Sequence, residues 1–253
     1  MQLQGKVALV TGGAHRVGKA IVLALAREGV HVMVHYGRSA DAAQETVREL
    51  ETLGVDAATY SADLRNPDAI APLFAATAER FGRLDILVNS AASFVKEPFD
   101  EITLDSWKNV MQTNLRAPFL CTQQAAPLMR QVQRPADEPA LIVNITDLSA
   151  LYPWPDYVQH GVSKGGLVNL TVATANALAP DIRVNAIAPG AILPPPGVDA
   201  DSEQWQNLGQ KVPLKRTGSP DMIGHTVVFL AQNDYITGAL IPVDGGEHII
   251  GTK

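Results

Sequence analysis

The stretch that decides the fold is KVALVTGGAHRVG, residues 6–18, near the amino terminus. Its first part, Lys6–Thr11, is short, apolar and rich in valine, which is typical of a buried strand. Gly12, Gly13 and Gly18 follow, and an Ala-rich segment comes next. Glycines let the backbone turn sharply and approach a pyrophosphate, which the amino terminus of the following helix attracts. The stretch therefore predicts a strand, a phosphate-binding turn and a helix, with a simple chain reversal as the alternative.

Outward from this stretch, short β-branched runs alternate with longer Ala/Leu-rich segments almost to the end of the chain. This alternation predicts a parallel sheet wrapped by helices. The apolar runs are nearly continuous, as expected for strands that are covered on both faces. The expected strands are Lys6–Thr11, His31–His35, Ala57–Ser61, Leu84–Asn89, Ala140–Ile145, Arg183–Ala188 and Ala239–Val243. We therefore expect an α/β fold with one wide seven-stranded sheet.

Polar residues and prolines mark where the helices between these strands begin and end. Ser39, Asn66 and Ser219 are expected to cap three helices, and the last two precede a proline at the first helical position. The segment Asp156–Leu178 is predicted to be one helix that Pro180 ends.

Two stretches interrupt the alternation, a polar connection at residues 131–139 and an insertion at residues 193–213. Residues 193–213 open with three consecutive prolines at positions 194–196 and follow the end of an expected strand. Because ligands of such sheets bind outside the carboxyl ends of the strands, the insertion is either a lid or an ordinary surface loop.

The composition excludes several classes of protein. The 253 residues carry 20 Lys and Arg against 26 Asp and Glu, a net charge of −6, and 46% are hydrophobic. This argues against disorder and against a general attraction to nucleic acid or anionic membranes. Cys121 is the single cysteine, so no disulfide within the chain and no Cys-rich zinc site can form, and the histidines show no ligand spacing. We expect a cytoplasmic protein without a metal site.

The end of the second expected strand indicates which dinucleotide binds. An acidic residue about 20 positions after the glycines is typical of NAD-binding folds. Here the sequence is His35-Tyr36-Gly37-Arg38-Ser39, without a carboxylate. Arg38 and Ser39, together with Arg16, offer donors for an adenosine 2′-phosphate and favour NADP(H). In the alternative, Arg38 is a solvated surface residue, and His15 and His35 either support the phosphate region or lie at the surface.

Short motifs in a specific order carry a resemblance to a known family. They are TGxxxRxG at residues 11–18, HYxRSA at 35–40, ADL at 62–64, LVN at 87–89, NxxAPF at 114–119, RVN at 183–185, PG at 189–190, ITG at 236–238 and VDGG at 243–246. The chain resembles the short-chain dehydrogenase/reductase family over essentially its whole length, and within it is most similar to the pteridine reductases.

The resemblance implies a doubly wound Rossmann fold with helices on both faces of the parallel sheet. It implies one NADP(H)-binding domain, residues 1–253, in what is usually a homotetramer, and a small-molecule substrate. Asp63 would lie near the adenine. The cofactor-binding residues implied are Gly12, His15, Arg16, Val17, Tyr36, Arg38, Ser39, Asp63, Leu64, Asn89, Ala91, Lys164, Pro189, Gly190 and Ile192.

The catalytic residues match the family only in part. Carbonyl-reducing members use a Tyr four residues before a Lys and a Ser thirteen residues before that Tyr. Here Lys164 is in place, His160 stands at the Tyr position and Asp147 at the Ser position. Pteridine reductases also carry Asp there. Asn114 matches the residue that organises the proton relay in the family.

His160 leaves the origin of the proton open. Lys164, one helical turn away, disfavours a positive charge on the imidazole, and a neutral imidazole is a weak acid. Asp147 would either stabilise a protonated His160 or hold the transferable proton itself. Tyr157, three residues before His160 on the same helix face, offers a third route, although we treat it first as a substrate contact and otherwise as a packing residue.

Three functions follow from these residues. The first is an NADPH-dependent reductase of a pterin or a related C=N or C=O substrate, in which Phe94 matches the aromatic that holds a pterin against the nicotinamide. The second is a catalytically impaired NADP(H)-binding subunit with a regulatory or scaffolding role, which His160 favours. The third is an oxidoreductase with another substrate, which Ala92, in place of the usual Ser, and the proline-rich insertion favour.

Overall fold

A parallel sheet forms the middle of the molecule. The computed structural model describes residues 1–135, 137–194, 197–199 and 201–250. Within them, seven strands pair in the order β3-β2-β1-β4-β5-β6-β7, and every pairing is parallel. The strands are β1 (Val7–Thr11), β2 (His31–Tyr36), β3 (Ala57–Ser61), β4 (Ile86–Asn89), β5 (Ala140–Ile145), β6 (Ile182–Pro189) and β7 (Leu240–Val243). The strand order reverses between β1 and β4, as in a doubly wound Rossmann fold.

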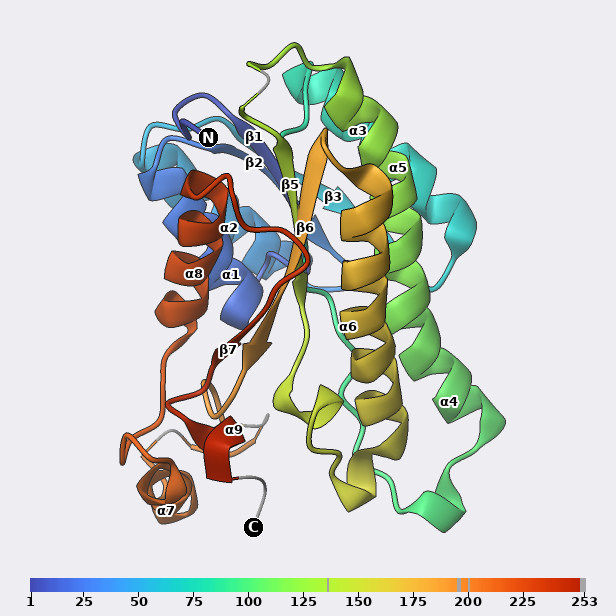
Figure 1. Cartoon of the computed structure of the whole chain (residues 1–253), viewed down its shortest axis with the longest axis vertical. Coiled ribbons are helices and arrows are strands. Elements are labelled where there is room, and N and C mark those ends of the chain that lie inside the picture. Colours follow the sequence, from blue (N-terminus) through green and yellow to red (C-terminus); the bar gives the residue numbers. More distant parts are fainter. Residues whose placement is uncertain (136, 195–196, 200, 251–253) are drawn as a thin grey trace.

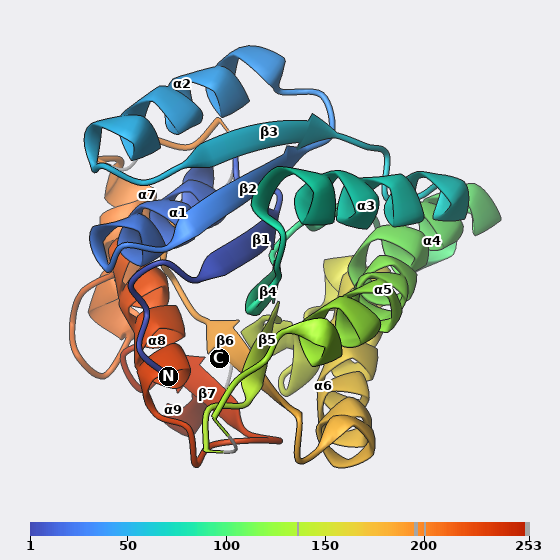
Figure 2. The same cartoon turned by 90° about the horizontal axis from the view of Figure 1, so that it is seen from above.

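Helices cover both faces of this sheet (Figures 1 and 2). One face carries α1 (Arg16–Arg27), α2 (Ala40–Thr52) and α8 (Pro220–Gln232), and the other carries α3 (Ile70–Phe81), α4 (Leu104–Met111), α5 (Ala117–Gln131) and α6 (Val158–Leu178). Two short helices, α7 (Glu203–Lys211) and α9 (Glu247–Ile250), lie near each other at one end of the sheet. The fold class predicted from the sequence is confirmed.

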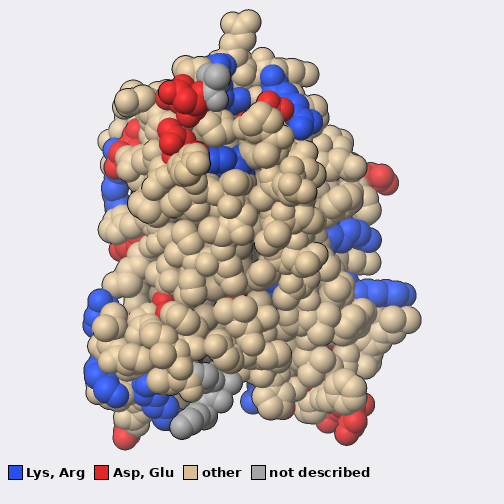
Figure 3. All heavy atoms as spheres, in the orientation of Figure 1, with Lys and Arg blue, Asp and Glu red and all other residues tan. Residues whose placement is uncertain are grey.

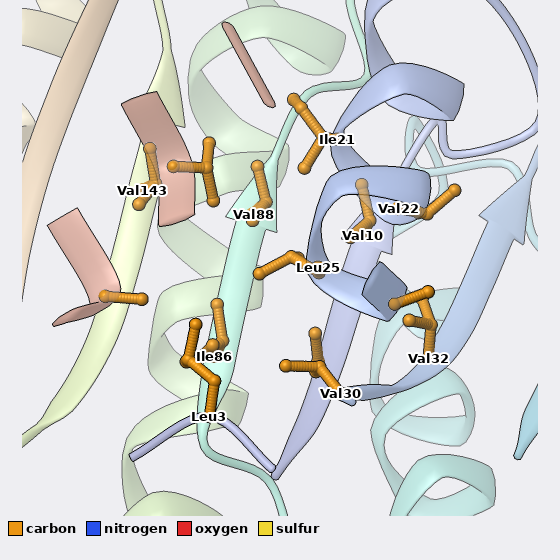
Figure 4. Close-up of a cluster of buried hydrophobic side chains, with 14 of the residues drawn as sticks. Leu3, Val10, Ile21, Val22, Leu25, Val30, Val32, Ile86, Val88 and Val143 are labelled. Carbon is orange, nitrogen blue, oxygen red and sulfur yellow. The ribbon is translucent and has the colours of Figure 1, made fainter. Parts of the chain in front are cut away.

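The two faces of the sheet bury two separate hydrophobic cores. Along β1, Ala8 and Val10 join the core under α1 and α8, whereas Leu9 joins the core under α3 and α5. This is the two-residue period of a strand, and it leaves every position of β1 buried. Figure 4 shows the first core, in which Ile21 and Leu25 of α1 pack against the strands.

All seven predicted strands exist, and their bounds differ from the prediction by at most two residues. The capping predictions were right once: the Asn66 side chain accepts a hydrogen bond from the Asp68 N–H at 3.1 Å. Ser39 and Ser219 stand at the cap positions of α2 and α8, but neither side chain makes a capping hydrogen bond, so these two predictions were wrong.

The segment predicted as one helix over Asp156–Leu178 is divided. A 3₁₀ turn at Pro155–Tyr157 precedes α6, which begins at Val158 and ends at Leu178 before Pro180. The turn therefore places Tyr157 just before α6 and not within it.

The insertion at residues 193–213 contains α7, while positions 195, 196 and 200 lie outside the described residues. In the part of the chain that the structure describes, no helix is both long and apolar enough to span a bilayer. On the face in Figure 3, charged side chains of both signs lie mostly towards the two ends, and the middle is largely uncharged.

Candidate active site

The turn after β1 leaves no room for side chains. Gly12 has a φ of 67°, and a Cβ there would come within 3.0 Å of the Ala91 Cα atom. A Cβ on Gly18 would overlap the carbonyl oxygen of Gly12. Only glycine therefore lets the turn close on the start of α1 and on the loop after β4. This is the shape that a close backbone approach to a phosphate requires.

The buried side chain of His35 fixes this turn. Its Nδ1 atom accepts the N–H of Gly12 at 3.2 Å, and its Nε2 atom lies 3.0 Å from the carbonyl oxygen of Ala62. Nδ1 must accept and Nε2 must donate, so the ring is the neutral Nε2–H tautomer. Burial lowers the pKa of His35 and outweighs the opposing hydrogen bond to Ala62. His35 is therefore not a surface residue but holds the glycine turn, whereas His15 is exposed.

The two arginines that were predicted to donate hydrogen bonds to a 2′-phosphate, Arg16 and Arg38, lie in different surroundings. Arg16 adopts a φ of 55°, and its Nη2 atom donates to the carbonyl oxygen of Pro194 at 2.9 Å, which joins the glycine turn to the insertion. Arg38 is exposed. Asp63 pairs with Arg65 at 2.6 Å, and this hydrogen bond holds the pKa of Asp63 at about 2, with a smaller contribution from the charge of Arg38. A joint contact of Arg16 and Arg38 with one phosphate stays a prediction.

Asn89, at the end of β4, carries a polar atom without a partner. Its Nδ2 donates to Asn144 Oδ1 at 2.8 Å, but the buried Oδ1 atom of Asn89 has no hydrogen bond within the described residues. The neighbouring loop is held by Thr11, whose Oγ1 accepts the Ala91 N–H at 3.1 Å. A buried orphan acceptor beside the glycine turn fits a site that a polar ligand completes.

The other predicted cofactor residues divide between a cavity and the core. Pro189 and Gly190, at the end of β6, line the cavity described below. The side chain of Leu64 is buried in one core and that of Ile192 in the other, so only their backbone atoms are available to a ligand. Val17 and Tyr36 are partly buried; Val17 packs against the first core, and Tyr36 ends β2.

The predicted catalytic residues converge where β5 ends. Asp147 follows β5, and its Oδ1 accepts the Ser149 N–H at 2.7 Å. The Nε2 atom of His160, on α6, lies 3.8 Å from Asp147 Oδ2. Lys164 is buried one turn further along α6, and its Nζ donates to the Ile145 carbonyl at 2.8 Å. Burial lowers the pKa of Lys164 to about 8, and the charge of Asp147 opposes this.

Asn114 determines which ring nitrogen of His160 is a hydrogen-bond donor. It lies in a π-helical turn, residues 112–116, between α4 and α5. Its Oδ1 accepts the Ser93 N–H at 2.7 Å, so its Nδ2 is the donor, to the Ser93 carbonyl at 2.9 Å and to Ser163 Oγ at 3.1 Å. These two bonds use both amide protons. His160 Nδ1, 3.2 Å from the same carbonyl, is therefore the donor of that contact, and Nε2 faces Asp147.

The charges around Asp147 favour one of the alternatives left open by the sequence. Burial raises the pKa of Asp147, but the nearby His160 imidazole and the Ser149 N–H outweigh burial and lower it overall. An ionised Asp147 is thus favoured over an Asp147 that holds the proton at rest. The side chain of His160 is 3% exposed and that of Asp147 22%, so Asp147 is the more accessible partner.

Aromatic rings form a wall beside this pair. Phe94 stacks on Tyr157 with the ring centroids 4.5 Å apart, and its ring lies edge-on to His160 at 4.7 Å. Trp154 packs edge-on against both Phe94 and Tyr157. Phe94 remains 44% exposed, so a ring face is available for a flat ligand.

A cavity of about 530 Å³ lies along this wall. It is lined by the predicted substrate residues Phe94 and Tyr157, by Gly190, and by two residues outside the predicted site, Trp205 and Glu247. Trp205 lies on α7, inside the insertion, and Glu247 opens α9. No motif marks either residue, because only the folding of distant segments brings them to the end of β6.

The fold is the doubly wound Rossmann fold, which many nicotinamide-dependent oxidoreductases share. The family model described as enoyl-(acyl carrier protein) reductase matches residues 12–248. A 3-oxoacyl-[acyl-carrier-protein] reductase of Synechocystis sp. is 34% identical, over 96% of this chain and 97% of the relative. The chain belongs to the short-chain dehydrogenase/reductase family.

Solved structures agree. FolM alternative dihydrofolate reductase 1 from Brucella canis, complexed with NADP, has a TM-score of 0.88 and 33% identity, and the match covers 98% of this chain and 96% of that one. A blue fluorescent protein from a metagenomic library, in complex with NADPH, has a TM-score of 0.87 and 33% identity, with 97% and 99% covered. The resemblance predicted from the sequence is confirmed for the family, and the similarity to FolM supports the likeness to pteridine reductases.

Proposed function

We propose that the chain, as one domain over residues 1–253, is an NADPH-dependent reductase of a flat heterocycle such as a pterin, or of a related C=N or C=O substrate. The observation that carries this proposal is the pair of His160 and Asp147, 3.8 Å apart, beside a cavity with an aromatic wall. Lys164, buried behind the pair, supplies the positive charge that the family places there.

The residues around the glycine turn fit NADP(H). Gly12 and Gly18 allow a pyrophosphate to approach the backbone closely, and Asn89 Oδ1 is a buried acceptor without a partner in the described residues. Arg38 is exposed and would supply the cation that a 2′-phosphate needs. When bound, the reduced nicotinamide supplies the hydride. Two similar structures contain NADP or NADPH, which supports the choice of cofactor.

Asp147 and His160 would provide the proton together. Ser93 and Asn114 hold His160 with Nδ1 as donor, so that Nε2 is the atom that exchanges a proton with Asp147. Asp147 is the more exposed partner and would pass the proton to the nitrogen or oxygen of the substrate while His160 replaces it. After each turnover the pair regains one proton from solvent. Lys164 would stabilise the carboxylate that this transfer leaves.

A second function is favoured by the surroundings of His160. Its buried Nε2 has no hydrogen bond within the described residues, as expected if a proton donor had been lost. In that case the chain would bind NADP(H) without turnover and act as a regulatory or scaffolding subunit.

The deciding experiment follows NADPH consumption, with NADH in parallel, using oxidised and dihydro-pterins, folates, quinones and a 3-oxoacyl thioester. We expect wild-type turnover of a pterin, and loss of turnover by about a hundredfold or more in Asp147→Ala. Silence in the wild type, with NADPH still bound and activity gained in His160→Tyr, would establish the second function. Turnover of the 3-oxoacyl thioester alone would show that the substrate is a 3-oxoacyl thioester and not a pterin.

The proposal extends to assembly and location. Phe119 of α5 and Val162 and Val172 of α6 are exposed apolar side chains, and β7 is an edge strand, which supports a homotetramer. We further propose a cytoplasmic protein with a small-molecule substrate and with neither nucleic acid nor membrane as a partner. Light scattering of the purified protein tests the assembly, and a mass of one chain would refute it.

A further inference from the structure

Glu247 is a carboxylate that the sequence motifs do not explain. It follows the turn at residues 243–246, in which Gly245 and Gly246 have φ values of 64° and 89°. The buried Asp244 accepts the N–H groups of Gly246 at 3.0 Å and His248 at 2.7 Å. These bonds fix the start of α9, so the backbone that carries Glu247 is held firmly at the wall of the cavity.

The Glu247 carboxylate lies across the end of β6. Its Oε2 atom accepts the Ala191 N–H at 3.3 Å, a long hydrogen bond, and a Cβ on Gly190 would come within 2.8 Å of this oxygen. Within the described parts of the chain, no Lys, Arg or His nitrogen lies within 4.0 Å of the carboxylate, so no ion pair occupies it. The carboxylate therefore has acceptor capacity that its own chain does not use.

The surroundings make this capacity unusual. Burial raises the pKa of Glu247, the Ala191 N–H opposes it, and the charges of Asp244 and Asp147 add to the rise. The rest of the cavity wall is mainly aromatic and aliphatic, and the other charged residue on it, Lys211, is exposed. A half-buried carboxylate in such a place is stabilised by a ligand that donates hydrogen bonds to it.

We infer that Glu247 determines substrate specificity by accepting two hydrogen bonds from an amino group and the adjacent ring N–H of a heterocycle. The two oxygens of a carboxylate match the parallel donors of such a cyclic amidine edge. Phe94 and Trp205 would hold the ring plane. In an analogue with a carbonyl in place of the amino group, the carbonyl oxygen would face the Glu247 carboxylate, and both are hydrogen-bond acceptors. This inference rests on the proposed function and names the substrate edge that the site selects.

The test compares two ligands by calorimetry at saturating NADP⁺: 2-amino-4-oxopteridine and 2,4-dioxopteridine. We expect the wild type to bind the amino compound at least tenfold more tightly, because the dioxo compound leaves a buried acceptor unmatched. Glu247→Gln should reduce this preference to about threefold or less without weakening the dioxo compound. Glu203→Gln removes an exposed carboxylate of α7 outside the cavity lining and should keep the wild-type preference.

Equal binding of the two ligands by the wild type, or binding of neither, would overturn the inference, and so would a preference that survives in Glu247→Gln. Steady-state kinetics supply a second readout: in Glu247→Gln the KM for the amino substrate should rise while kcat changes little. The two proposals fail separately. Preferential binding without any NADPH oxidation would refute the reductase and leave the role of Glu247 standing, whereas turnover without preference would refute only the role of Glu247.

Discussion

The two halves of the ligand-facing edge of the sheet are built in different ways. Around β1 and β2, the turn is made of residues close in sequence, its glycines have no space for a Cβ, and His35 ties it to the sheet. Around β5 and β6, the cavity is made by Phe94, Trp205 and Glu247, which lie far apart in the chain. Trp205 belongs to the insertion, part of which lies outside the described residues.

This difference teaches where specificity resides. A phosphate group is the same in every dinucleotide, and a tight turn of backbone N–H groups recognises it, so a short motif is enough. A substrate ring is recognised by side chains on several loops, which can change without disturbing the sheet. Substitutions should therefore separate the two halves: those near β1 should alter cofactor binding and stability, and those near β5 and β6 should alter turnover and substrate choice.

The largest effect is expected at Lys164. Lys164→Met keeps the length of the buried side chain but removes the positive charge that stabilises the Asp147 carboxylate. We expect kcat to fall by about a hundredfold or more, since general acid catalysis of this kind contributes roughly that much. Stopped-flow single turnovers with bound NADPH would measure the chemical step itself. An unchanged rate of that step would show that the proposed proton transfer does not depend on Lys164.

The next effect concerns the choice between NADPH and NADH. Arg38→Gln removes the exposed guanidinium near the end of β2, and we expect NADPH affinity to fall about tenfold with NADH affinity unchanged. Fluorescence titration of the two cofactors measures both. Arg27→Gln, at an exposed position in the last turn of α1, is the matched control and should alter neither affinity. If Arg38→Gln leaves the preference intact, Arg16 or another group must contact the 2′-phosphate.

A third effect, on the free energy of unfolding, is expected at His35. His35→Leu leaves the Gly12 N–H and the Ala62 carbonyl without partners, and this should cost about 1–3 kcal/mol in the free energy of unfolding. His31→Leu is the matched control on the same strand, since His31 Nδ1 accepts the Asp56 N–H at 2.9 Å far from the glycine turn. Both variants should lose stability in urea, but only His35→Leu should also lose NADPH affinity. Equal NADPH affinity in the two variants would show that His35 does not support cofactor binding by the glycine turn.

The same contrast explains what the sequence could predict. Buried parallel strands need continuous apolar runs, so runs such as Ala140–Ile145 marked the strands to within two residues. The roles of Asp147, which follows β5, and of Lys164 on α6 were implied by the resemblance to the family. The cap predictions at Ser39 and Ser219 failed because a capping residue type does not guarantee that its side chain turns to the helix N–H groups.

Some features of the site depend on tertiary contacts and carry no local signal. The donor role of His160 Nδ1 follows from Ser93, which lies in another loop and takes two hydrogen bonds from Asn114 and His160. Likewise Glu247 reaches the cavity only because β7 pairs with β6 and is followed by the turn at Gly245 and Gly246. No spacing rule within one element connects these residues.

The last prediction concerns how the free energy of unfolding depends on pH, which distinguishes the buried Lys164 from His35 at the glycine turn. The pKa of Lys164 is about 8 in the folded protein, against 10.5 for the free side chain, because burial disfavours its charge. Between these values the unfolded chain holds a proton that the folded chain lacks, so the free energy of unfolding should rise with pH, by roughly 1 kcal/mol per pH unit. Urea denaturation of the wild type and Lys164→Met at pH 7, 9 and 10 measures the difference. The wild type should gain on the variant as pH rises from about 8 towards 10, whereas His35→Leu should run parallel to the wild type there, because burial already keeps that ring neutral. If the free energy of unfolding changed with pH in the same way in the wild type and in Lys164→Met, Lys164 would keep its positive charge in the folded protein, stabilised by Asp147.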